Sequence, residues 1–233
     1  MRKALFLLLG LAVMAMGAQA AQAGLDEAKI ALHLQAHQAK NQCSTYAPDT
    51  TLACDGVTKT SNLVVTGSTG VSYDMYLVVV DVPPAEGLRA IEFGIEYDGT
   101  PLSGLDPYGS VMCSDLLFAN SNWPNGDATA AATYTWSTCQ NTVDPSDPQG
   151  ECAIVCGSIY CYAYNPDTAC IVVKPSGYYD ATDCGLNTVD LLPNFPANRG
   201  CAGFGQPGTD PCLGGVPVKE STWGQLKRQF IDD

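Results

Sequence analysis

The residues best suited to bind a ligand are three tyrosines at alternate positions, Tyr160, Tyr162 and Tyr164. Alternate residues of a β-strand point to the same face of a sheet, so the three rings are expected to form one row. Rows of aromatic rings can stack on sugars, and they can equally cover a hydrophobic core. The spacing leaves two interpretations open: a ligand-binding face, and a packed surface of the sheet.

Residues suited to catalysis are sparse. His33 and His37 are four positions apart, which on a strand separates them by roughly 13 Å, too far to share a metal ion. The sequence contains no Gly-x-Ser-x-Gly nucleophile motif. Glu92 and Glu96 share a strand face and are a pair that a glycosidase could use, but most carboxylates of so acidic a chain are expected to be solvated. We predict that the protein is not an enzyme, with a secreted hydrolase as the least favoured alternative.

No cofactor is expected. Asp144 and Asp147 have oxygen ligands that suit Ca²⁺, but they lack the spacing of an EF-hand loop, so a turn is predicted there. The central cysteines do not have the paired Cys-x2-Cys spacing of a zinc site, as their positions at Cys152, Cys156, Cys161 and Cys170 show.

All 11 cysteines follow the first 42 residues, and disulfides are the expected use of so many. Each bridge is expected to contribute ~2–4 kcal/mol to stability. Because local loops close most simply, the predicted pairs are Cys43 with Cys54, Cys113 with Cys139, Cys161 with Cys170, and Cys184 with Cys201 or Cys212. An odd number of cysteines leaves at least one thiol free or paired between chains.

Residues 1–23 are predicted to be a cleaved secretion signal, with cleavage after Ala20 or Ala23. Two basic residues precede an apolar run that is shorter than the roughly 20 residues of a membrane-spanning helix. Small residues follow at the spacing that signal peptidase accepts. The basic region consists of Arg2 and Lys3, the apolar run is Ala4–Met16, and the cleavage motif is Ala18-Gln19-Ala20. The mature chain is therefore expected to be periplasmic or extracellular, without insertion in a membrane.

The charge of the chain limits the classes of partner. Its formal net charge is −13, and removal of the basic Arg2 and Lys3 with the signal makes the charge near −15. Nucleic acids and anionic membranes are disfavoured as partners, because both bind clustered Lys and Arg side chains. Divalent cations and basic partners are attracted instead. The expected partner is a protein or a glycan.

The hydrophobic pattern predicts a mainly β protein. Period-two alternation at Lys29–His37 and at Leu88–Tyr97 indicates strands, and Ile91, Phe93 and Ile95 are expected to face the core. Cys152–Tyr164 and Ala169–Lys174 are expected to pair as a hairpin. We predict a single domain over residues 24–219, a β-sandwich of seven to ten antiparallel strands from about residue 28 to 175 with a cysteine-rich loop region at about 176–219.

Residues 220–233 are predicted to form a short amphipathic C-terminal helix. Its apolar stripe has helical spacing and consists of Trp223, Leu226 and Phe230. Because an isolated helix of this length is marginal in water, the stripe is expected to dock on its own domain or on a partner.

Two resemblances to known proteins support this fold. The run Tyr76–Pro83, followed by Gly87–Asp98, resembles the opening hairpin of cohesin-like β-sandwich domains over about 25 residues. Most of the mature chain is similar to uncharacterised secreted proteins of environmental bacteria, on segments at Ile30–His33, Glu92–Tyr97, Trp136–Gln140, Gly203–Gly205, Asp210–Cys212 and Thr222–Lys227. The resemblances imply an exported globular protein with an immunoglobulin-like or cohesin-like β-sandwich.

The function predicted from the sequence is that of a secreted, non-catalytic extracellular domain with an interaction or structural role. A carbohydrate-binding module that uses the tyrosine row is the first alternative. A planar, exposed row would favour carbohydrate, whereas a deep pocket with converging carboxylates would favour an enzyme.

Overall fold

The computed structural model describes residues 24–38, 40, 42–43, 52, 54–55, 60–126, 129–142 and 152–213. The strands in this part of the chain are β1 (Lys29–Ala36), β2 (Cys54–Asp55), β3 (Thr60–Ser61), β4 (Thr66–Gly67), β5 (Val71–Val82), β6 (Leu88–Glu96), β7 (Leu105–Met112), β8 (Leu116–Ala119), β9 (Ala131–Gln140), β10 (Cys152–Ala163), β11 (Asp167–Val172), β12 (Asp180–Thr182), β13 (Thr188–Asp190) and β14 (Cys201–Phe204). Short 3-10 turns occur at Leu25–Glu27, Leu192–Asn194 and Pro211–Leu213.

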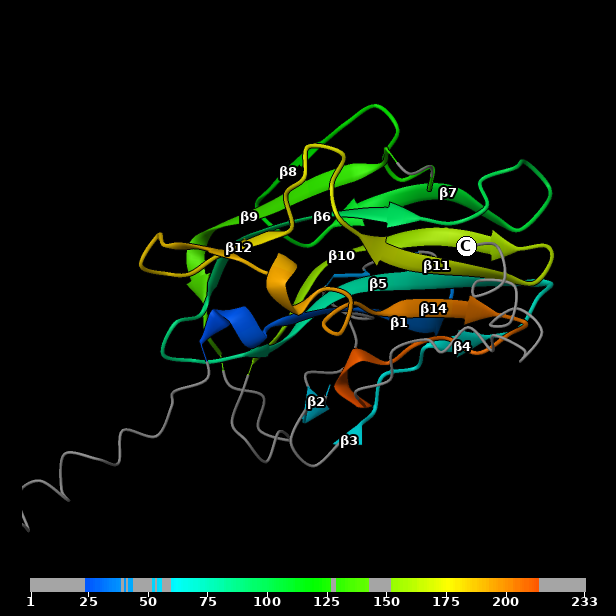
Figure 1. The fold of residues 1–233 in the computed structure, drawn as a ribbon. Coiled ribbons are helices and arrows are strands. Elements are labelled where there is room, and N and C mark those ends of the chain that lie inside the picture. Colours follow the sequence, from blue (N-terminus) through cyan, green and yellow to red (C-terminus); the bar gives the residue numbers. More distant parts are fainter. Residues whose placement is uncertain are drawn as a thin grey trace, which may run out of the picture.

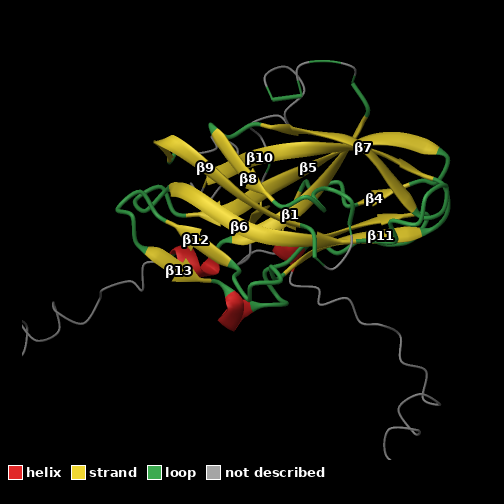
Figure 2. Ribbon diagram, turned by 90° about the horizontal axis from the view of Figure 1, so that it is seen from above, coloured by secondary structure: helices red, strands yellow, loops and turns green. Residues whose placement is uncertain are grey.

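Two main sheets pack against each other (Figures 1 and 2). One sheet has four strands in the order β1-β5-β10-β7. The other has the order β13-β12-β6-β11-β14-β4, with β9 paired to β6 and β8 paired to β9. Among the described strands of the main sheets, the pairing is antiparallel except between β14 and β4. The prediction of a mainly β, antiparallel sandwich is confirmed.

The main core lies between the two sheets and is built from alternate residues of their strands. Ile91, Phe93 and Ile95 of β6 are fully buried, as predicted, and belong to one cluster with inward residues of β5 such as Met75 and Leu77. Burial of each such side chain stabilises the fold by ~1.5–3 kcal/mol. The alternation explains why these segments form strands, because period two places one apolar face on the core.

Three aromatic rings fill one part of this core. The ring of Phe93 stacks on Tyr134 with the ring centroids 5.8 Å apart, and it meets the edge of Trp123 at 6.1 Å. Trp123 also lies 6.2 Å from Tyr134 in an edge-on arrangement. These offset and edge-on contacts add to the energy of burial and link β6 to β9 and to the loop before β9.

A second hydrophobic cluster covers part of the outer face of the four-stranded sheet. It joins outward residues of β1 and β5 to Leu52, Leu63 and the pair Cys54 and Cys212. The segment at residues 62–65 runs beside β1, where the Leu34 N–H donates to the Val64 carbonyl. Both faces of β1 are thus buried, whereas its alternating pattern predicted a half-buried strand.

This second layer buries the His33 side chain. His33 is 6 % exposed, and its Nδ1 accepts a hydrogen bond of 3.1 Å from the Val64 N–H. Burial lowers the pKa of His33 from its ordinary 6.5 to about 4. The imidazole is therefore neutral in the folded protein, because the Val64 amide occupies the nitrogen that a proton would need.

Acidification is expected to destabilise the fold through His33. Since the folded pKa is about 4 and the unfolded value is 6.5, the unfolded chain binds more protons between these values, and the free energy of unfolding should fall by about 2–3 kcal/mol from pH 7 to 4.5. Urea denaturation of the wild type and of His33→Asn at both values measures this effect. The asparagine oxygen can still accept the Val64 N–H, so the variant should lose that part of the pH dependence. Equal pH dependence in both proteins would contradict the assignment.

The segments predicted to form a hairpin, β10 and β11, belong to different sheets. β10 lies between β5 and β7, whereas β11 lies between β6 and β14. The turn between them is a corner of the sandwich rather than a hairpin loop. The prediction of a hairpin is therefore wrong. The turn at residues 165–168, Asn-Pro-Asp-Thr, is compatible with a hairpin and also with a crossing from one sheet to the other. The inward side chains of β10 and β11 are buried between the sheets because the two strands lie in opposite sheets.

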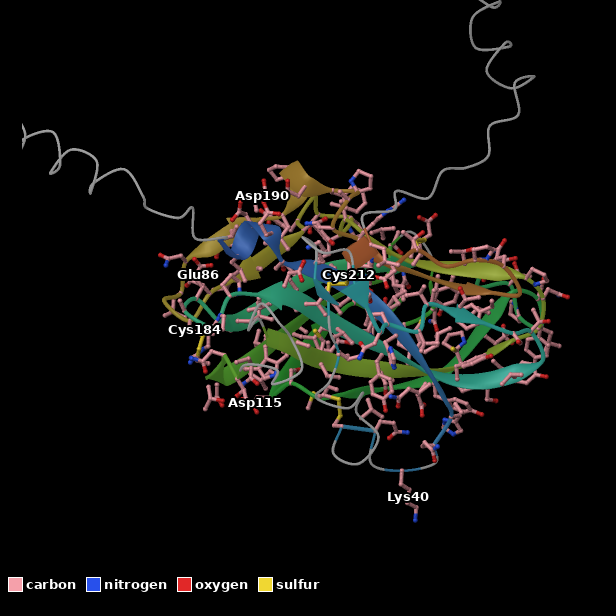
Figure 3. All side chains as sticks on the ribbon, turned by 90° about the horizontal axis from the view of Figure 1, so that it is seen from below. Lys40, Glu86, Asp115, Cys184, Asp190 and Cys212 are labelled. Carbon is pink, nitrogen blue, oxygen red and sulfur yellow. A yellow bond between two sulfur atoms is a disulfide. The ribbon has the colours of Figure 1, made fainter. Side chains whose placement is uncertain are left out.

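The structure contains four disulfides among the described residues: Cys43–Cys113, Cys54–Cys212, Cys139–Cys184 and Cys170–Cys201. None of the predicted pairs forms. The partners are 70, 158, 45 and 31 residues apart, because the strand order brings distant segments together. Figure 3 shows Cys184 and Cys212 in separate parts of the molecule, so the bridges stabilise different regions.

Cys161, predicted to pair with Cys170, is a free thiol, as is Cys156. Both thiols are buried in the core, since they lie on the inward side of β10. Burial raises the pKa of each well above its usual value, so both stay protonated. Cys170 instead bridges to Cys201, its direct partner in the register between β11 and β14.

The region from residue 176 to 213, predicted to be an irregular loop region, contributes strands to the larger sheet. β12 extends the sheet from β6, β13 continues it, and β14 pairs with β11 on the other side. These strands are three or four residues long, which is too short for period-two alternation to be visible in the sequence.

The predicted signal at residues 1–23 and the predicted helix with Trp223, Leu226 and Phe230 lie outside the described residues. The helices of the described part are 3-10 turns of three residues each. None of them is long and apolar enough to cross a membrane.

Candidate functional site

The predicted tyrosines lie at one end of the outer face of the four-stranded sheet. Tyr160 and Tyr162 alternate on β10 with Cys161 and Ala163, which are buried in the core, so the two tyrosines point outward. Tyr164 directly follows β10, and its ring lies 4.6 Å from the ring of Tyr162. The structure therefore brings the three rings to one side of the sheet, and their role in binding stays a prediction.

Two further rings, which the spacing of the tyrosines did not predict, extend this row. Tyr108 of the edge strand β7 lies 5.4 Å from Tyr160, and its hydroxyl is 3.0 Å from that of Tyr164. On the opposite side, the ring of His37 stacks on Tyr160 at 3.8 Å with an angle of 17° between the planes. We call these five residues, His37, Tyr108, Tyr160, Tyr162 and Tyr164, the tyrosine surface.

A buried carboxylate holds His37 in place. Asp74 of β5 is 1 % exposed, and its Oδ1 lies 2.9 Å from Nδ1 of His37. Its other oxygen accepts a hydrogen bond of 2.8 Å from the Gln38 N–H. Asp74 is the register partner of Tyr160, so the imidazole reaches across the carboxylate to the tyrosine ring. The orientation of the His37 ring is therefore fixed by its contacts with Asp74 of β5 and Tyr160 of β10.

The other end of the tyrosine surface is open to solvent. Tyr108 is 54 % exposed, while the rings on β10 are half-buried. The hydrogen bond with Tyr164 raises the pKa of Tyr108 to about 12, so this phenol is neutral at physiological pH. Asp106 of β7 lies opposite Tyr162 in the register and places a carboxylate on the same face.

Sequence reasoning missed Tyr108 and His37 for different reasons. Tyr108 lies in a segment rich in Gly, Pro and Ser, a composition typical of loops, and only the pairing of β7 with β10 places it beside Tyr160. His37 follows the end of β1, and nothing in its distance along the chain from Tyr160 indicates that the two rings stack. The two histidines have separate partners, Val64 and Asp74, and do not form a joint site.

The acidic residues considered for catalysis have other roles. Glu92 forms an ion pair of 3.0 Å with Lys174 and accepts a hydrogen bond from the Thr133 hydroxyl. Glu96 is exposed at the end of β6, and four residues of strand separate the two by roughly 13 Å, beyond the range of a glycosidase pair. Asp144 and Asp147 lie outside the described residues.

A pocket of about 440 Å³ beside the end of β6 also has polar groups in its lining. The Thr100 hydroxyl and amide hydrogen-bond with Asp98, which lowers the pKa of this carboxyl and disfavours a role as a general acid. Within the described residues, no group of three or more His, Cys, Asp or Glu side chains is arranged to hold a metal ion. The lining residues are Glu96, Tyr97, Asp98, Thr168, Cys170 and Arg199.

No protein-family model matches the chain, and no curated protein matches it in sequence. Among solved structures it is similar to the cohesin module of a family 33 glycoside hydrolase from Clostridium perfringens, with 10 % identity, a TM-score of 0.39, and coverage of 60 % of this chain and 89 % of the module. The sixth cohesin of scaffoldin B from Acetivibrio cellulolyticus, solved in complex with a Cel5 dockerin, has 16 % identity, the same TM-score of 0.39 and the same coverages of 60 % and 89 %.

A type II cohesin domain from the cellulosome of Acetivibrio cellulolyticus has 11 % identity and a TM-score of 0.37, covering 54 % of this chain and 82 % of that domain. The similarity to secreted proteins of environmental bacteria stays a prediction.

Proposed function

We propose that this protein is an extracellular, non-catalytic binding domain and that the tyrosine surface is its binding site. The observation that carries the proposal is the convergence of five rings from three segments on the solvent side of one sheet, with Tyr108 54 % exposed. Tyrosine suits binding because it offers a large rigid contact area and a hydroxyl at a small entropic cost.

The disulfides support the extracellular part of the proposal. Four bridges among the described residues are typical of a protein that matures in an oxidising compartment. The free thiols found among the described side chains, Cys156 and Cys161, are buried and have raised pKa values, so they are protected from exchange in such a compartment. The predicted signal at residues 1–23 agrees with export.

The enzymatic alternative has less support. The carboxylate of Glu92 is engaged with Lys174, and that of Asp98 accepts a hydrogen bond from the Thr100 N–H. The carbohydrate-binding alternative uses the same tyrosine surface and is favoured by its phenol hydroxyls, which can donate to sugar oxygens.

The proposal predicts that Tyr108→Ala lowers binding at least tenfold, because an exposed tyrosine in a binding surface is a preferred hot spot. Tyr178→Ala is the matched control, since Tyr178 is also 54 % exposed but lies in the turn between β11 and β12. Binding of the mature protein is measured on an array that carries both glycans and peptides.

The control is expected to bind within twofold of the wild type, and both variants should melt within a few degrees of it. Equal binding by Tyr108→Ala and Tyr178→Ala would contradict the proposed site.

A further inference from the structure

We propose that the ligand of the tyrosine surface is a basic segment of a partner protein, held through its Lys or Arg side chains. The inference rests on the proposed function and names the class of ligand. It commits to a cationic peptide rather than to a glycan, because both the charge and the ring geometry of the surface favour that class.

Negative charge borders the rings on two strands. Asp74 lies opposite Tyr160 and Asp106 lies opposite Tyr162, so each outward tyrosine of β10 has a carboxylate on a neighbouring strand. One oxygen of Asp106 accepts a hydrogen bond from the Leu102 N–H, which fixes the carboxylate beside the rings. The whole chain has a net charge of −13, so its field attracts a basic partner over a longer range.

Among the described residues, no basic side chain forms an ion pair with Asp106. Lys29 and Lys174 form ion pairs with Asp81 and Glu92, which lie on other parts of the sandwich. Lys40 follows His37 in the chain, but Figure 3 shows it projecting away from the body of the molecule. Asp74 is already paired with His37, so a cation supplied by a partner would complement the carboxylate of Asp106.

The orientation of the rings favours a cation over a sugar. Tyr108 and Tyr160 are tilted by 38°, and Tyr162 and Tyr164 by 60°, so the rings do not form a flat platform for successive pyranose rings. A guanidinium or ammonium group needs the face of only one ring, within about 6 Å of its centre. This chain already makes such a contact elsewhere, where Cζ of Arg199 lies 5.0 Å from the Phe195 ring.

The surface charge can be tested with two variants of equal net charge. Asp106→Asn removes the carboxylate from the tyrosine surface but keeps an oxygen for the Leu102 N–H. Glu27→Gln removes one charge from an exposed residue before β1, at the end of that strand away from His37. The probes are an octalysine peptide, an octaglutamate peptide, cellohexaose and chitohexaose, measured by titration calorimetry at moderate salt.

The wild type is expected to bind the octalysine peptide and not the octaglutamate peptide. Asp106→Asn should weaken binding of octalysine at least fivefold and Tyr108→Ala at least tenfold, while Glu27→Gln stays within twofold. Equal losses for Asp106→Asn and Glu27→Gln would overturn the inference, because net charge alone would then explain the binding. Binding of either oligosaccharide that depends on Tyr108, without binding of octalysine, would also overturn it, while leaving the tyrosine surface as the site of the proposed function.

Discussion

Replacing Cys54 and Cys212 together by alanine is expected to lower the free energy of unfolding by about 3–5 kcal/mol. This disulfide joins residues 158 positions apart, the longest separation among the four described bridges. A longer closed loop removes more entropy from the unfolded chain. Both sulfurs are also buried in the second hydrophobic cluster, so the substitution loosens the layer over β1 and β5. Urea denaturation of the mature protein measures the change.

The matched control for this prediction is the double variant of Cys139 and Cys184. These residues are 45 positions apart and half-buried, so their replacement should cost about 1 kcal/mol less. A loss below about 2 kcal/mol for the Cys54 and Cys212 variant, or a larger loss for the control, would show that the outer layer contributes little to stability.

Phe93→Ala is expected to lower the free energy of unfolding by about 3–5 kcal/mol, because it leaves a cavity beside two aromatic neighbours. Phe93 is fully buried and contacts Trp123 and Tyr134. Phe118→Ala on β8 is the control, since Phe118 is 62 % exposed and its loss should change stability by less than about 0.5 kcal/mol. Similar losses in both variants would mean that the buried ring of Phe93 contributes no more to stability than an exposed ring does. Thermal and urea unfolding of the same samples give the comparison.

The central strands could be predicted from the sequence because apolar and polar side chains alternate along them, and this alternation shows which face is buried. Ile91, Phe93 and Ile95 alternate with polar or small residues on β6, and this period is visible without any tertiary information. The turns that flank β5 and β6 could be predicted as well, because they contain glycine and proline. The antiparallel β-sandwich followed from these local patterns.

The strand pairing and the disulfides could not be predicted in the same way. β10 and β11 each have a local pattern that suits a hairpin, and only the packing of two sheets decides that they separate. Choosing cysteine partners by nearness in sequence fails for the same reason, since Cys170 meets Cys201 across two neighbouring strands. The binding site was predicted in part, because Tyr160 and Tyr162 share one strand, whereas Tyr108 joins them only through pairing of β7.

The disulfide pattern sets a requirement on how the protein is made. Cys43 and Cys54 leave the ribosome before the other cysteines, yet their partners follow 70 and 158 residues later. If an oxidant acts on thiols as they emerge and joins these first two cysteines to each other, that bond must be exchanged before either native partner can be used. We therefore expect maturation to depend on a disulfide isomerase, and the yield in a host without one to be limited by exchange rather than by translation.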